Sequence, residues 1–241
     1  MRQAYTMETP SNSTLTGKLV DTETATAALQ LPSSGADSVF IGGDSDGNDA
    51  LQYSANARIA NARIYSTPLT AQQVAALADQ ELPEQSTDPE EPENPETLTP
   101  DMLNVDFTDG TAQDKSETQN TLNPAGSPVI EKDAEMGKNV GVFNGSYDAY
   151  LYPFDDTKYS KMSDGVTIES IFKYDEVPSS GEYDMFSNQQ GGGIGLAWKA
   201  AGCSSSATST RAGATTVMFS PTPRSRPANG TTLWVCLTAA Q

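Results

Sequence analysis

Residues 38–80 read SVFIGGDSDGNDALQYSANARIANARIYSTPLTAQQVAALADQ and carry the strongest strand and helix signals of the chain. The β-rich run 39–41 meets a glycine pair at 42–43, which predicts a strand followed by a turn. Residues 57–66 predict a second strand that kinks midway, because apolar Ile59 and Ile64 sit among small and charged residues. This part of the chain therefore predicts antiparallel β structure.

A short helix is expected to follow the second strand. Pro68 ends that strand, because proline cannot donate a hydrogen bond to the ladder. Thr70 is placed as the N-cap of the helix, and Gln73, three residues on, is placed as its capping-box partner. The apolar side of the helix consists of Val74, Ala75 and Leu77.

The order of strand, glycine turn, strand and terminal helix resembles the C-terminal end of a LamG-like module of the concanavalin A-like lectin/glucanase superfamily. Residues 18–23 (KLVDTE) resemble the hairpin strand of such modules, and residues 28–32 would form the next strand. The resemblance implies a two-sheet antiparallel jelly-roll β-sandwich. It also implies an extracellular unit that binds a ligand or a carbohydrate.

A second module is expected after residue 100. Leu103, Val105 and Phe107 lie on one face of a predicted strand. Residues 166–174 alternate cleanly, with Val166, Ile168, Ser170, Phe172 and Tyr174 on one face and Ile171 on the other. Together with DFTDG (106–110) and VFNGSYDAYLYP (142–153), these strands resemble the N-terminal half of another LamG-like module.

The predicted fold class is therefore all-β, with two incomplete antiparallel jelly-roll β-sandwich modules. Residues 1–80 would be the C-terminal part of a first module and residues 101–241 the N-terminal part of a second. Residues 81–100 would link them, because 81–97 are acidic, proline-rich and almost without apolar side chains. Each incomplete module should leave apolar faces exposed, for example at Val166, Ile168 and Phe172. The alternative is that the two parts complement each other, as in a circular permutant.

Two kinds of segment carry no β pattern. Residues 1–17 and the tail from Trp198 are polar and aperiodic, which is typical of low-complexity sequence. We interpret 1–17, 198–213 and 224–241 as translated out of frame, because a single shift of the reading frame allows each to encode a strand of a LamG-like module. Under this hypothesis Cys203 and Cys236 are artefacts rather than a disulfide pair.

Charge and composition limit the function. The formal net charge of −18 argues against nucleic acid and anionic membranes as partners. The chain has no histidine, which removes Ser-His-Asp and Cys-His catalysis and the commonest metal ligand. No apolar run is long enough to cross a bilayer, and residues 1–12 lack the apolar core of a signal peptide. The resemblance to LamG-like modules implies a parent protein at the cell surface or outside a bacterial-type cell.

Residues 44–49 offer a possible cation site. Asp44, Asp46 and Asn48 place oxygen atoms at alternating positions on a tight loop, which suits a hard cation such as Ca²⁺. An EF-hand would need glutamate at the twelfth position, where this chain has Ala55. We therefore expect at most weak calcium binding, and a solvated Asp/Gly/Asn turn is the alternative.

An aromatic group offers a possible ligand site. Tyr147, Tyr150 and Tyr152 lie close to Asp148 in the sequence, and aromatic faces beside a carboxylate can stack on a sugar and hydrogen-bond to it. The predicted ligand-binding residues are Tyr147, Asp148 and Tyr150. The alternative is that these tyrosines pack in the core or rim of the sandwich.

No catalytic constellation is recognised. Glycosidases of this superfamily carry a Glu-x-Asp-x-x-Glu strand, whereas Glu169 has no second acid at the right spacing and is expected to be an outward polar residue. The sequence favours a non-catalytic module that binds a glycan or another extracellular ligand. The alternatives are an accessory part of a hydrolase (a calcineurin-like phosphoesterase or a glycosidase) with its catalytic domain outside this chain, or a structural or adhesion spacer.

Overall fold

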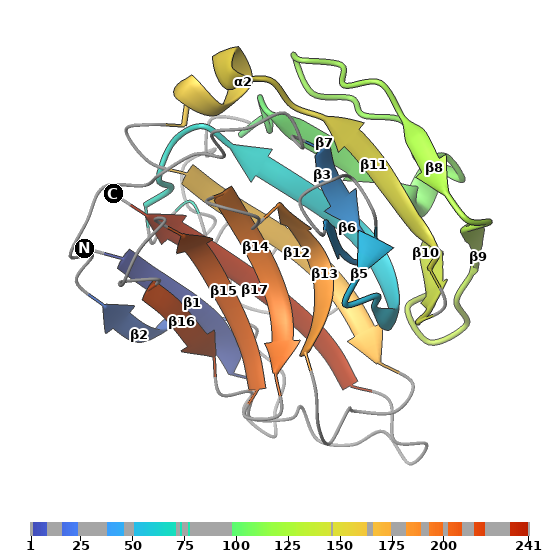
Figure 1. Ribbon diagram of the computed structural model, residues 1–241. Helices are drawn as coiled ribbons and strands as arrows, with labels where there is room; N and C mark the ends of the chain where they lie inside the picture. The colour runs from blue at the N-terminus through green and yellow to red at the C-terminus, as the bar shows by residue number, and fades with distance from the viewer. Residues whose placement is uncertain are drawn as a thin grey trace.

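The computed structural model describes residues 2–8, 16–23, 38–45, 51–70, 73, 77, 98–145, 147–162, 166–174, 182–188, 193–199, 202–208, 215–219 and 232–240. These residues form two antiparallel sheets that pack face to face, with very little helix (Figure 1). The predicted all-β sandwich is confirmed. Its assignment as a jelly roll stays a prediction.

The first sheet has eight strands. Its order is β2 (Thr16–Glu23), β1 (Arg2–Glu8), β17 (Thr232–Ala240), β12 (Val166–Tyr174), β6 (Asn56–Tyr65), β10 (Asn139–Asn144) and β9 (Val129–Lys132), with β7 (Leu103–Asp106) also paired to β6. β1 and β17 are neighbours, which brings the two ends of the chain to the same side of the molecule (Figure 1).

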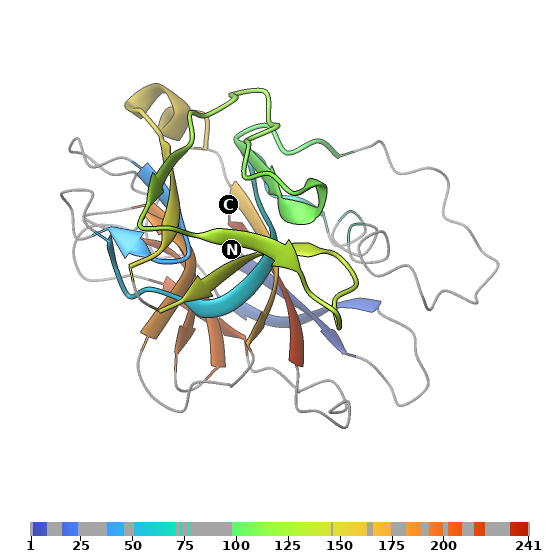
Figure 2. The same cartoon turned by 90° about the vertical axis from the view of Figure 1, so that its right-hand side faces the viewer.

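The second sheet has seven strands. Its order is β16 (Thr215–Phe219), β15 (Gly202–Thr208), β14 (Gly193–Lys199), β13 (Glu182–Asn188), β3 (Ser38–Ile41), β11 (Ala149–Pro153) and β8 (Asn123–Ala125). A small ribbon pairs β4 (Asp44–Ser45) with β5 (Leu51–Gln52), and the short helices η1 (Phe107–Asp109) and α2 (Asp156–Ser160) lie in the connections. Seen from the side, β8 to β11 cover one end of the sandwich (Figure 2).

Strands from both predicted modules share the same sheets. β6 lies between β12 and β10, and β3 lies between β13 and β11. This is the complementation weighed as the alternative in the sequence analysis. The expectation that Val166, Ile168 and Phe172 are exposed is wrong, because these side chains are buried in the core that both segments build. The origin of the segments in two separate modules stays a prediction.

The kink predicted in the second strand is a β-bulge. Across β12 and β6, Ile171 pairs with Asn61 but the next residue, Phe172, pairs with Ile59. At this point β6 therefore has one residue more than β12, which is the definition of a β-bulge. Before the bulge Ile59 of β6 faces the core, and after it the next core-facing residue is Ala62, three positions on. β12 itself alternates as predicted, with Val166, Ile168, Phe172 and Tyr174 in the main core and Ile171 in a separate cluster on the opposite face.

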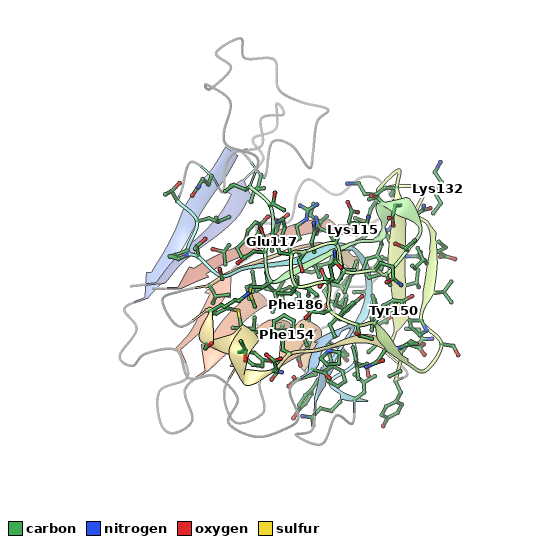
Figure 3. All side chains as sticks on the ribbon, turned by 90° about the horizontal axis from the view of Figure 1, so that it is seen from above. Lys115, Glu117, Lys132, Tyr150, Phe154 and Phe186 are labelled. Carbon is green, nitrogen blue, oxygen red and sulfur yellow. The ribbon has the colours of Figure 1, made fainter. Side chains whose placement is uncertain are left out.

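The core between the sheets is rich in aromatic rings. Phe107, Phe143 and Tyr150 pack together with ring centroids 5.6–6.4 Å apart. Viewed from above, Tyr150 and Phe186 lie within the molecule, whereas Lys132 points outward at its edge (Figure 3). Gly42 has φ +97°, and a Cβ atom there would lie 2.1 Å from Phe143 Cδ1. The turn after β3 therefore requires glycine for its backbone conformation and for its contact with the core.

The predicted start of the terminal helix is confirmed. Thr70 N donates to Gln73 Oε1 at 2.8 Å, and Gln73 N donates to Thr70 Oγ1 at 3.3 Å, which are the two reciprocal bonds of a capping box. Leu77 then packs with Tyr65 and Leu69 against the partly buried Leu98. The chain segments on either side of the predicted linker are therefore in contact.

Strands also form in the segments that carry no β pattern in sequence. β1 lies in the range 1–17 and β15, β16 and β17 lie in the tail, although neither range alternates in sequence. Main-chain hydrogen bonds hold a strand in a sheet whatever its side chains are, so an aperiodic segment can pair where neighbouring strands offer an edge. The reading-frame hypothesis stays a prediction.

Other expectations are not tested. The strand at 28–32 and the linker at 81–97 lie outside the described residues. Within the described part of the chain, no helix is both long enough and apolar enough to span a membrane.

Candidate functional site

Three large hydrophobic side chains of the described structure are exposed, two on turns and one at the start of β9. They are Tyr53 (51% exposed), Val129 (53%) and Tyr147 (71%), and we call them the tyrosine rim. Scattered single apolar residues are normal on a surface, but a group of them on adjacent turns is typical of an interaction site.

Hydrogen bonds hold the turns of the tyrosine rim together. Asn56 at the start of β6 is paired with Asn144 at the end of β10. Gly145 N donates to Ala55 O at 2.8 Å, which ties the turn that follows Tyr53 to the turn that precedes Tyr147. The two tyrosines therefore come from adjacent connections at the same end of the sandwich, and the asparagine pair lies between these connections.

A third turn joins them through Asp148. Ser127 N donates to Asp148 Oδ1 at 2.9 Å, which fixes the β8–β9 turn against the residue after Tyr147. Gly126 has φ +67°, and a Cβ atom there would lie 2.5 Å from Tyr147 O. The close approach of these two turns requires glycine, and it leaves Val129 at the start of β9 beside them.

The backbone of both tyrosines is strained. Tyr53 has φ +48° and Tyr147 has φ +61°, a left-handed region that residues with a bulky side chain rarely adopt. Such outliers cluster at functional sites, where the surrounding structure holds them in place. Here Asp184 N donates to Tyr53 O at 3.0 Å, and the bonds of Gly145 and Asp148 hold the turn on either side of Tyr147. The outcome is two aromatic rings directed into solvent.

The structure separates the predicted ligand-binding residues. Tyr147 is exposed and Asp148 is half-buried beside it, but Tyr150 packs in the aromatic core and its hydroxyl donates to Pro128 O at 3.3 Å. Tyr152 is fully buried and its hydroxyl donates to Ala112 O. Burial raises the pKa of both Tyr150 and Tyr152 above its ordinary value. For these two residues the alternative of core packing is the arrangement observed.

The predicted calcium loop is described only at its start. Asp44 is buried on β4, next to the paired strand β5, whereas Asp46 and Asn48 lie outside the described residues. Among the residues that the structure places, no group of three or more acidic or cysteine side chains is positioned to hold a metal ion. Calcium binding at this loop stays a prediction.

Glu169 lies on the face of β12 away from the main core, as the sequence suggested, but it is not exposed to solvent. Its side chain is buried (1% exposed), and its carboxylate accepts hydrogen bonds from Arg63 Nη1 at 2.8 Å and from the Tyr65 hydroxyl at 3.0 Å. A third bond comes from Asn61 Nδ2 at 3.4 Å. These three partners come from β6, a pairing that sequence alternation within one strand could not predict. This carboxylate holds two strands together and is not directed into a cleft.

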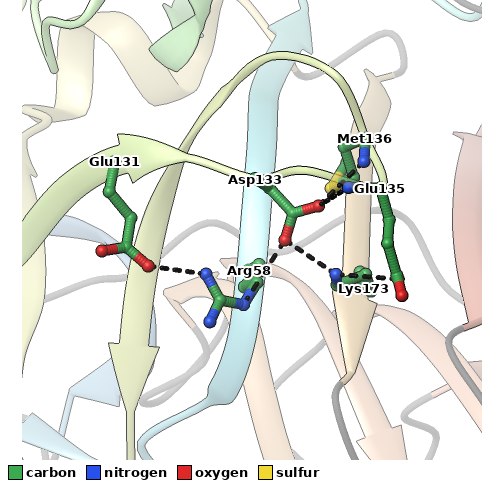
Figure 4. Close-up of polar contacts among 6 residues, drawn as sticks. All are labelled: Arg58, Glu131, Asp133, Glu135, Met136 and Lys173. Carbon is green, nitrogen blue, oxygen red and sulfur yellow. Dashed lines mark hydrogen bonds and ion pairs between the residues drawn. The ribbon is translucent and has the colours of Figure 1, made fainter. Parts of the chain in front are cut away.

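A second buried ionic group lies on the same pair of strands (Figure 4). Lys173 Nζ lies 2.7 Å from Asp133 Oδ2 and 3.1 Å from Glu135 Oε2, and Arg58 Nε approaches the same Asp133 oxygen at 3.5 Å. Both Lys173 and Asp133 are almost fully buried, with 5% and 4% of their side chains exposed. This group ties the β9–β10 loop to β6 and β12.

The pKa values in this ionic group shift in opposite directions. Burial alone would raise the pKa of Asp133, but hydrogen bonds from Lys173 and from the backbone of Met136 and Glu135 outweigh it and hold the pKa below its ordinary value. Burial would lower the pKa of Lys173, but its bonds to Asp133 and Glu135 raise it. Both groups are therefore charged at neutral pH, and they stabilise the fold rather than forming an acid–base pair.

The tyrosine rim is the arrangement best suited to contact a ligand. The sequence analysis identified Tyr147 and Asp148 but missed Tyr53 and Val129, although Tyr53 stands between polar residues ahead of the predicted strand 57–66, which was a usable signal. No family model matches the chain, and no curated protein or solved structure is found to be similar to it.

Proposed function

We propose that this chain is a non-catalytic binding module that recognises a glycan through the tyrosine rim. The observation that carries the proposal is the exposure of Tyr53 and Tyr147, both held in left-handed backbone conformations on turns that hydrogen bonds join. Maintaining strained, solvent-exposed aromatic rings is unfavourable for folding alone, which supports a role in binding.

The chemistry of the rim suits a sugar. Aromatic rings offer flat apolar faces for the C–H face of a pyranose, and the tyrosine hydroxyls remain hydrated at the edge. Asn56 and Asn144 are exposed between the two turns and can donate to and accept from sugar hydroxyls. Two exposed rings on a shallow surface suggest a dissociation constant of about 10⁻⁴ M, or about −5.5 kcal/mol.

The carboxylates described above favour binding over hydrolysis. Glycoside hydrolysis needs two carboxyl groups on either side of an open cleft. Glu169 and Asp133 are instead buried and hydrogen-bonded to basic residues of the sheets. We infer that the module serves a secreted or surface protein, in which any hydrolase activity lies in a catalytic domain outside this chain.

A glycan array with the full chain tests the proposal. The best ligand is then titrated by calorimetry against the wild type, Tyr53→Ala and Tyr147→Ala, with Lys132→Ala as the matched control, because Lys132 is exposed at the other end of β9. Each tyrosine variant should weaken binding about fivefold, equivalent to about 1 kcal/mol, and the control should bind normally.

Two results would overturn the proposal. Binding that is equally strong in the tyrosine variants would place the ligand elsewhere. A chain that binds no glycan on the array would favour the structural or adhesion spacer. Repeating the titration with 1–10 mM Ca²⁺, a range that includes the weak end of calcium affinities of roughly 10⁻³ M, tests the predicted loop at Asp44, Asp46 and Asn48 in the same experiment.

A further inference from the structure

The turns of the tyrosine rim carry a single charged side chain, and it is acidic. Residues 52–56, 124–129 and 144–148 contain no lysine or arginine, and their only charged residue is Asp148. Asp148 directly follows Tyr147 and is half-buried at the surface. A ligand that covers the exposed ring of Tyr147 therefore lies close to a carboxylate.

One oxygen of this carboxylate is held by the protein. Ser127 N donates to Asp148 Oδ1 at 2.9 Å, which fixes the position of the group. Within the described part of the chain, no lysine or arginine forms an ion pair with it, and no donor bonds to Oδ2. Oδ2 can therefore accept a hydrogen bond from a ligand, and such a bond is strongest when the donor carries a positive charge.

The surroundings of the rim do not neutralise this charge. Arg58 of β6 is already engaged, with Glu131 Oε1 at 2.8 Å and Asp133 Oδ2 at 3.5 Å. Lys132 lies at the far end of β9 and points outward at the edge of the molecule (Figure 3). The formal net charge of −18 adds a negative field around the whole chain. A ligand at the rim therefore meets a negative potential.

The aromatic rings add a preference of the same sign. The face of a tyrosine ring carries partial negative charge, so it attracts a cation that lies over it. Tyr53 and Tyr147 present such faces to solvent. A sugar that carries a positive charge satisfies the rings and Asp148 together, whereas a sugar that carries a carboxylate is repelled by both.

We propose that the tyrosine rim selects a basic glycan, a chain of amino sugars with free ammonium groups; this inference rests on the glycan-binding function proposed above. The C–H faces of the sugars stack on Tyr53 and Tyr147, and an ammonium group donates to Asp148 Oδ2. Neutral glycans bind more weakly, and chains of uronic acids bind least.

Three β-1,4-linked hexasaccharides that differ in one substituent per sugar test this selectivity. They are the hexamers of glucosamine, glucose and glucuronic acid, which are cationic, neutral and anionic. Calorimetry with the full chain at about pH 6 keeps the amines charged, since an α-amino group has a pKa of about 7.7. The glucosamine hexamer should bind about tenfold more tightly than the glucose hexamer, and the glucuronic acid hexamer about tenfold more weakly.

Asp148→Asn is the decisive variant, because an asparagine oxygen can still accept from Ser127 N after the charge is removed. It should reduce the preference for glucosamine over glucose to about threefold, and leave the binding of the glucose hexamer unchanged. Glu117→Gln is the matched control, because it removes the same charge from an exposed residue. Glu117 lies apart from Tyr150, whose hydroxyl donates to Pro128 O at the rim (Figure 3). This control should keep the preference of the wild type.

Hexalysine, which carries the same number of positive charges without sugar faces, measures attraction by charge alone. Hexalysine binding as tight as that of the glucosamine hexamer, or an equal loss of preference in Asp148→Asn and Glu117→Gln, would assign the preference to net charge and overturn this inference. Equal binding of the three hexasaccharides would overturn it and leave the proposed glycan-binding function standing. If none of the three binds, this inference is also overturned, and the glycan array decides the proposed function separately.

Discussion

Replacing Lys173 with methionine should destabilise the protein by about 3 kcal/mol. Met fills a similar volume, so the change removes the charge and leaves Asp133 buried without its nearest cation. Removing one partner of a buried ion pair costs about 3–5 kcal/mol. The lower end applies here, because Arg58 Nε at 3.5 Å and the backbone N–H groups of Glu135 and Met136 still contact the carboxylate.

Urea unfolding followed by circular dichroism measures this loss. Lys115→Met is the matched control, because the Lys115–Asp109 pair is also short, at 2.5 Å, but lies on the surface. An exposed pair contributes little, and its loss should stay within about 0.5 kcal/mol. For Lys173→Met the melting temperature should fall by about 6–12 °C.

A double variant separates the ion pair from packing. Asp133→Asn with Lys173→Met removes both charges, so its loss should be smaller than the sum of the two single losses by about 1–3 kcal/mol. Additive losses, or a Lys173→Met variant as stable as the Lys115→Met control, would refute the role given to this buried group.

Four further outcomes are expected. Stability should fall as the pH drops below about 4, because the pKa of Asp133 lies below its unfolded value of about 3.9 and its contribution is lost on protonation; acid titration of Asp133→Asn should show a smaller loss. Gly42→Ala should cost about 3 kcal/mol or more in urea unfolding, since its Cβ would strike Phe143 and its φ is +97°; a neutral result would contradict the described turn. Thr70→Ala should cost about 1 kcal/mol by removing the capping box, and Thr70→Ser, which keeps the hydroxyl, should not. Tyr147→Gly should raise the melting temperature by relieving about 1 kcal/mol of strain, whereas Tyr147→Ala should give no gain.

The strands with strong alternation could be predicted from the sequence. In β12 and β7 the apolar side chains repeat every second residue, and the structure places them in the main core as expected. The capping box at Thr70 could also be predicted from the sequence, because its two partners are three residues apart. In each of these cases the deciding interactions are local, or follow from which face of a strand is apolar.

Pairing between strands could not be predicted in the same way. Alternation shows which face of a strand is buried, but not which strand lies beside it. For this reason the sequence left open whether residues 38–80 and 101–199 complete each other, and it left Glu169 without its partners on β6. β1 and β17 were missed because main-chain pairing leaves no periodic trace in their side chains.

The candidate site was partly predictable for a related reason. Tyr150 and Tyr152 lie two residues apart on β11 and share its core-facing side, whereas Tyr147 lies in the turn before the strand begins. Closeness in sequence therefore grouped side chains that point in different directions. Tyr53 joins Tyr147 only through contacts between distant turns, which a single sequence does not reveal.

The bulge in β6 changes which of its charged residues share a face of the sheet. Arg58 and Arg63 are five positions apart, and in a regular strand an odd interval places two side chains on opposite faces. The extra residue restores an even count, so both arginines reach the face away from the core, where Arg58 meets Asp133 and Arg63 meets Glu169. If the same residues paired without the bulge, one of the two guanidinium groups would turn into the apolar interior, whereas deleting Ala60 would leave the arginines four positions apart and on the same face. The bulge thus decides on which side of the sheet half of this strand carries its charge.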